Sequence, residues 1–196
     1  MRGRWFIVGV GVLLVVLGAA GGVVASGMIG SSADVESMES ATRDAAMVRL
    51  ADISSANGQS ARGVFAQITS TGQFCLWDAP SPSSRQGLGG CNPVDDPLGG
   101  HPLSASFAYE GGPDPADVKD ARLIGLVSSE VAEVEVVMTD GSRRTLSLRR
   151  VPSSVGDFRV FAHRFGRGEL RRGITPTSVV ALDASGTEID RQATGF

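Results

Sequence analysis

Histidine, cysteine and lysine are scarce in this chain of 196 residues, which has two histidines, two cysteines and the single lysine Lys119. It also lacks the Gly-x-Ser-x-Gly elbow of many hydrolases, the His-Glu-x-x-His motif of zinc proteases and the Gly-x-x-x-x-Gly-Lys loop that binds phosphates. The net charge is −3, which argues against nucleic acid as a partner. These absences remove the strongest sequence signals for hydrolysis, metal chemistry and nucleotide binding.

Charge is absent over a long N-terminal stretch, residues 5–29, which follows Arg2 and Arg4. A helix needs about 20 mostly apolar residues to cross a membrane, and positive charge resists export. The stretch therefore predicts a single transmembrane helix, with the N-terminus in the cytoplasm and the remaining chain outside the cell membrane. The alternative is a signal peptide cleaved near Ala25, where small residues precede the cleavage point, and this would give a secreted protein.

The two cysteines, Cys75 and Cys91, predict a disulfide, because a small even number of cysteines in an exported protein is usually paired. In the chain-entropy model a bond closing a loop of this size stabilises the fold by about 3 kcal/mol. The alternative is two free buried thiols. His101 and His163 are the only histidines available to join the cysteines in a metal site, but the spacing matches no zinc pattern. We therefore predict no metal and no cofactor.

Residues 34–50 have apolar side chains at helical spacing, with acidic residues early and Arg49 late, and so predict a short membrane-proximal helix, or stalk. Further along the chain, turn residues separate short apolar runs that predict strands. These runs are 64–68 and 73–77, joined by a turn at 70–72, then 102–109, 158–165, and finally 178–182 and 187–191, joined by a type I turn at 183–186.

The clearest strand pattern is the alternation of apolar and polar residues between positions 133 and 149, around an Asp-Gly turn. A two-residue loop would mix the two faces of the hairpin. A three-residue loop at 140–142 keeps the apolar residues together and sets Val136 opposite Leu146. We therefore expect the three-residue loop, with Gly141 or its neighbour at positive φ.

Short strands with turn signals every 8–12 residues predict an all-β fold, here an antiparallel Ig-like β-sandwich. The sequence Gly-Leu-Val-Ser-Ser-Glu-Val-Ala-Glu-Val-Glu-Val-Val-Met-Thr-Asp-Gly (125–141), together with Val-Val-Ala-Leu-Asp-Ala-Ser-Gly-Thr-Glu (179–188), resembles small Ig-like modules of bacterial surface proteins. With the N-terminal run and the cysteine pair, the layout resembles uncharacterised membrane-anchored extracytoplasmic proteins of high-GC Gram-positive bacteria. The resemblance implies a fold and a location but no activity.

The predicted organisation has four parts. They are an anchor or signal peptide (1–30), a stalk and linker (31–62), a disulfide-containing β subdomain (63–120) and the Ig-like half (121–196).

Arginine is concentrated between residues 143 and 172, a stretch that contains nine arginines and two acidic residues. This predicts a basic face that would bind a protein or an anionic component of the cell envelope by paired hydrogen bonds. The alternative is an ordinary solvated strand face, partly neutralised by Glu133 and Glu135. The candidate binding residues are Arg143, Arg144, Arg149, Arg164, Arg167, Arg171 and Arg172.

Together these patterns favour a non-enzymatic binding or structural module that is held at the membrane through residues 5–29. The alternative is an extracytoplasmic hydrolase that uses His101 or His163 with Asp95 or Asp96. A third reading, a sensor, needs a membrane partner, because four residues precede the apolar run.

Overall fold

The computed structural model describes residues 47–56, 58–84, 87–111, 114 and 117–194. Over these residues the fold is all-β, with twelve strands and the short helix α2 (Arg167–Leu170). No helix within this part of the chain is both long enough and apolar enough to cross a bilayer. The predicted membrane segment, and the predicted stalk helix up to residue 46, lie outside the described residues.

The strands form three four-stranded sheets, and neighbouring strands are antiparallel throughout. The N-terminal sheet has the order β1-β2-β3-β4, with bounds Val48–Ile53, Arg62–Ile68, Gln73–Ala79 and Leu88–Pro93. The central sheet has the order β5-β6-β10-β9, with bounds Leu103–Glu110, Asp120–Val127, Arg159–Arg164 and Arg149–Arg150. The C-terminal sheet has the order β12-β11-β7-β8, with bounds Glu188–Ala193, Pro176–Leu182, Glu133–Met138 and Arg143–Leu146.

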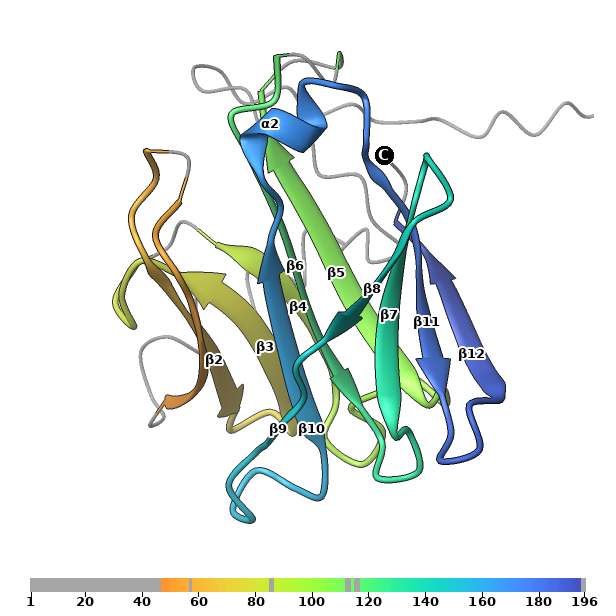
Figure 1. The fold of residues 1–196 in the computed structure, drawn as a ribbon. Helices are drawn as coiled ribbons and strands as arrows, with labels where there is room; N and C mark the ends of the chain where they lie inside the picture. The colour runs from red at the N-terminus through yellow and green to blue at the C-terminus, as the bar shows by residue number, and fades with distance from the viewer. Residues whose placement is uncertain (1–46, 57, 85–86, 112–113, 115–116, 195–196) are drawn as a thin grey trace, which may run out of the picture.

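The central sheet lies between the other two and is packed on both faces (Figure 1). One core, which includes Leu123 and Phe161, joins it to the C-terminal sheet. The other, which includes Ile124 and Val160, joins it to the N-terminal sheet. All eight residues of β6 are consequently buried, which explains why residues 123–127 form a continuous apolar run rather than an alternation. The structure therefore has a third layer beyond the predicted two-sheet sandwich.

The hairpin of β7 and β8 has the predicted three-residue loop, and Gly141 has the predicted positive φ of 79°. The loop comprises residues 139–141, one position earlier than expected, because the Met138 N–H donates to the Ser142 carbonyl at 2.9 Å. The pairing is shifted by two residues, so that Leu146 lies opposite Val134. A shift of two keeps every side chain on its predicted face.

The C-terminal hairpin turns where the sequence predicts, with the Gly186 N–H donating to the Asp183 carbonyl at 3.0 Å. The Asp183 carboxylate also accepts the Thr187 N–H at 2.9 Å. An irregularity in the ladder between β11 and β12 then shifts the pairing, and Val180 lies opposite Arg191. The turn is therefore confirmed, but the strand register differs from the one that the turn predicts, in which Val180 would lie opposite Ile189.

Two of the predicted boundaries do not separate structural units. β1 lies within the expected stalk and linker, and a strand replaces the last turn of the expected helix because Leu50 and Ile53 are buried in the core. The boundary expected between residues 120 and 121 falls after the first residue of β6, which is paired with β5 over eight residues. The central sheet therefore continues across it.

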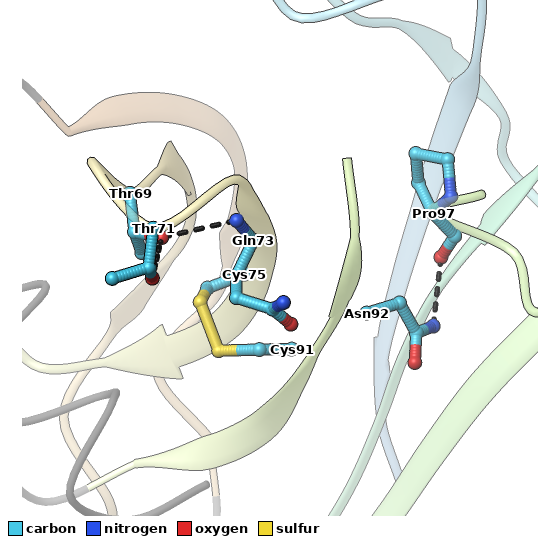
Figure 2. Close-up of a disulfide and its surroundings, with 7 residues drawn as sticks. All are labelled: Thr69, Thr71, Gln73, Cys75, Cys91, Asn92 and Pro97. Carbon is cyan, nitrogen blue, oxygen red and sulfur yellow. Dashed lines mark hydrogen bonds between the residues drawn. A yellow bond between two sulfur atoms is a disulfide. The ribbon is translucent and has the colours of Figure 1, made fainter. Parts of the chain in front are cut away.

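The predicted disulfide between Cys75 and Cys91 is present and joins directly opposite residues of β3 and β4, whose Cα atoms are 4.0 Å apart (Figure 2). In Ig domains the corresponding bond joins two sheets, whereas here it lies within one. Figure 2 shows Asn92 on the other side of β4, where its amide donates to the Pro97 carbonyl at 2.9 Å. The disulfide therefore occupies the face turned away from the central sheet.

Side chains of β12 close one edge of the central sheet. The Ala105 N–H donates to the Gln192 Oε1, and the Gln192 Nε2 donates to the Ala105 carbonyl, both at 2.9 Å. The Asp190 carboxylate accepts the Leu103 N–H at 3.2 Å. These side chains satisfy backbone groups that an edge strand would otherwise leave open, and they join the central and C-terminal sheets.

Candidate functional site

The seven arginines of the predicted basic face do not share one surface, and Arg164 points into the protein. Its side chain is 4% exposed, with Nε 3.1 Å from Asp120 Oδ1. Its NH1 donates to the carbonyls of Ser54 at 2.7 Å and Ser60 at 3.0 Å. Arg164 therefore holds the connection between β1 and β2 against β10 instead of facing a partner.

Two more members of the set are committed to carboxylates of the same chain. Arg143 donates to Glu135 at 2.7 Å. Arg144 forms a bidentate pair with Glu169 of α2, in which one of the two contacts measures 2.9 Å. The hydrogen bonds of this pair raise the pKa of Arg144 and lower the pKa of Glu169. The pair of Arg144 and Glu169 ties β8 to α2, and both guanidinium groups already have a carboxylate partner.

The remaining arginines gather at two separate places. Arg149 and its neighbour Arg150 form β9, which pairs with the first two residues of β10. Arg171 and Arg172 follow α2, which comes after the last residue of β10, at the other end of the strand (Figure 1). At about 3.3 Å per residue, a strand of six residues separates them by roughly 15–20 Å. These four side chains are exposed and make no ion pair within the described residues. Arg167, the first residue of α2, is partly buried.

A cluster of buried charges lies between the N-terminal and central sheets, and no sequence pattern indicated it. The Asp78 carboxylate is fully buried and accepts from Arg62 Nε at 2.8 Å and from Arg122 Nε at 2.6 Å. It also accepts the Leu88 N–H at 2.7 Å. Asp78 thus connects β2, β3 and β4 of one sheet to β6 of the next.

The cluster continues along the central sheet from Arg122. This guanidinium contacts Asp120 and, at 3.2 Å, Glu110. Burial disfavours its charged form, but the attraction to Asp78 together with Asp120 outweighs that effect and raises the pKa of Arg122. Like charges lie opposite each other across the strands, Arg122 opposite Arg164 and Glu110 opposite Asp120, so the pairing is diagonal. Three arginines balance three acids, and this cluster joins two sheets without leaving a charge for a substrate.

The two histidines occupy different environments, and neither is ion-paired with Asp95 or Asp96 in the part of the chain that the structure describes. His101 is exposed, and its Nδ1 lies 3.8 Å from Asp190 Oδ2. His163 lies on β10, with its ring edge-on to Phe165 at a centroid distance of 4.8 Å. Its buried Nε2 has no hydrogen-bond partner among the described residues.

We expect the protein to lose stability as the pH falls below about 6.5, the ordinary pKa of histidine. Burial first and the nearby Arg144 second lower the pKa of His163 in the folded state, while Glu169 opposes them. The unfolded chain therefore binds a proton more readily as the pH falls, and the loss ends once the folded state is also protonated. Urea unfolding between pH 7 and pH 5 measures this slope. It should shrink in His163→Gln and persist in His101→Gln, and an unchanged slope in His163→Gln would contradict the assignment.

No group of three or more histidine, cysteine, aspartate or glutamate side chains within the described residues is placed to hold a metal ion. Comparison of the chain with protein families, curated proteins and solved structures found no match. Any functional assignment therefore depends on the residues of this chain alone.

Proposed function

We propose that this chain is an extracytoplasmic binding or structural module, without catalytic activity, that is anchored in the membrane by residues 5–29. The observation that carries the proposal is the disulfide between Cys75 and Cys91, because such bonds persist in oxidising compartments and are rare in the cytosol. The uncharged N-terminal run and the two arginines before it point to the same location. The central and C-terminal sheets would then form the Ig-like sandwich that supports the binding surface.

We place the binding surface at the α2 end of the central sheet, where Arg171 and Arg172 are exposed and make no ion pair within the described residues, while the charge of Arg172 also helps to lower the pKa of Glu169. Guanidinium groups in this state can form bidentate hydrogen bonds with carboxylate or phosphate groups. The partner would be an acidic protein or an anionic polymer of the cell envelope. Arg149 and Arg150, equally exposed at the opposite end of β10, provide a matched comparison.

Lys119 allows a direct test of location, because it is the only lysine of the chain and is exposed. A membrane-impermeant, amine-reactive biotin reagent applied to intact cells should label the full-length protein. The variant Lys119→Arg should lose the label, since the N-terminal amine is expected to lie in the cytoplasm. Labelling that requires cell lysis would place the sheets in the cytosol and overturn the proposal.

The same lysine samples the proposed binding surface. Lys119 precedes β6, and the Phe165 N–H at the start of the α2 segment donates to the Ala121 carbonyl at 3.0 Å, so Lys119 and α2 lie at one end of the sheet. An impermeant cross-linker should therefore capture the partner on Lys119. A charge-assisted hydrogen bond contributes about 1.5–3 kcal/mol, so the double variant Arg171→Gln/Arg172→Gln should reduce capture about tenfold or more. Arg149→Gln/Arg150→Gln should leave capture unchanged, and the reverse result would move the surface to β9.

A further inference from the structure

The N-terminal sheet has an apolar outer face, which is the face turned away from the central sheet. It includes Phe65, Cys75 and Trp77, which are 2%, 0% and 3% exposed. Among the described residues, this group packs with Ala79, Met47 and Cys91, and the Arg49 guanidinium lies over the Phe65 ring, 5.9 Å from its centroid. The group is separate from the two cores that join the sheets. Side chains on the free face of an outer sheet are this deeply buried only when something covers them.

The outer face is an apolar platform over β2, β3 and β4, bordered on β1 by the ion pair of Arg49 and Asp52. A Cβ atom on Gly63 would lie 2.6 Å from the Phe65 ring. This ring therefore lies against a glycine position, as aromatic residues do when they shield glycine in a sheet. The disulfide holds β3 and β4 together on the same face. The platform suits an apolar partner.

We propose that the outer face of the N-terminal sheet is the docking surface for residues 34–46 of the same chain, which lie outside the described residues. Met47 packs against the face, and the preceding residues therefore approach it directly. Residues 34–46 directly precede Met47 and are therefore within reach of the platform.

The sequence of residues 34–46 suits such a surface. Val35, Met38 and Ala45 recur at the spacing of one helical face, whereas Ser37 and Ser40 fall on the opposite side. A helix of this length extends about 20 Å at 1.5 Å per residue. A strand of seven residues has about the same length. The segment therefore matches the platform in both polarity and reach.

Docking of this segment would also orient the module, an inference that rests on the proposed function. Residues 30–33 would be the whole connection between the membrane segment and the docked segment, and four residues reach at most about 14 Å. The N-terminal sheet would then face the bilayer. The C-terminal sheet, the layer on the far side of the central sheet, would face away from it.

Trp77 reports directly on the cover, because the chain has two tryptophans and Trp5→Phe leaves Trp77 as the only one. In the purified full-length Trp5→Phe protein, Trp77 should emit as a buried indole and be weakly quenched by acrylamide. Met38→Asp/Ala45→Asp in that background should shift the emission to longer wavelength and raise the quenching constant several-fold. The control Ser37→Asp/Ser40→Asp adds the same charge to the opposite side and should change neither quantity.

Hydrogen exchange of the β6 amides shows whether each variant keeps its fold, and Met38→Gln provides a milder substitution that should shift the emission in the same direction. Unchanged Trp77 emission in folded Met38 variants would overturn the proposal. So would emission that depends on protein concentration, because this would identify a second copy as the cover. The experiment uses purified protein, so its failure is independent of the Lys119 labelling result.

Discussion

Replacing Asp78 by alanine is expected to lower the free energy of unfolding by about 3–5 kcal/mol, the range for removing one partner of a buried ion pair. The carboxylate is fully buried and serves Arg62, Arg122 and the Leu88 N–H. Its loss would leave two guanidinium groups in the interior with less compensating charge. It would also remove a contact that connects the N-terminal and central sheets.

Urea unfolding at neutral pH measures this loss, with Glu188→Ala as the control. Glu188 also pairs with an arginine, Arg191, but both side chains are 41% exposed, and exposed pairs contribute little to stability because solvent screens them. Asp78→Asn keeps the shape and the acceptor for Leu88 and should fall between the two. If Asp78→Ala were as stable as the control, the cluster would not connect the sheets in the way described.

Replacing Gly125 by alanine is expected to lower the free energy of unfolding by about 3 kcal/mol or more, at or above the upper end of the usual range for overpacking. The added Cβ would lie 2.7 Å from Phe161 Cε1 and 2.5 Å from the Ser104 carbonyl oxygen. The oxygen belongs to the backbone of β5, which pairs with β6 along its whole length. Since β6 is packed on both faces, neither neighbour can move aside at low cost.

Thermal unfolding checks this expectation, because 1 kcal/mol corresponds to about 2–4 °C for a domain of this size. Gly125→Ala should therefore lower Tm by roughly 6–12 °C. Gly168→Ala makes the matched comparison, since nothing lies within 4 Å of a Cβ at that position, and it should change Tm little. Equal effects of the two substitutions would show that β6 tolerates a side chain at position 125.

The features that the sequence predicts correctly are local ones. The three predicted hairpin turns that carry a glycine occur within one residue of their expected positions, at Gly72, Gly141 and Gly186. The alternation of β7 identifies its buried face. The bond between Cys75 and Cys91 follows from the small number of cysteines. Each of these depends on residues that are near in sequence or on a choice with few alternatives.

The third sheet and the charge cluster depend on contacts between distant residues. Arg122 and Asp78 are 44 positions apart, and a charged residue read alone indicates solvent. The same reasoning assigned Arg164 to a basic surface, although its side chain is buried. β1 shows a related effect, because burial of Leu50 against the central sheet outweighs the local helical pattern. In the third sheet, the charge cluster and β1, the structure depends on which distant residues pack together. The periodicity of the sequence does not reveal those contacts.

The hydrogen bonds between Gln192 and Ala105 have a consequence for biosynthesis. Ala105 leaves the ribosome 87 residues before the side chain that closes its edge. Until β12 is made, β5 presents open N–H and carbonyl groups to any strand that it meets. The central sheet can therefore begin to assemble early in synthesis. The edge of β5, however, is protected from pairing with a neighbouring nascent chain only once β12 has been made.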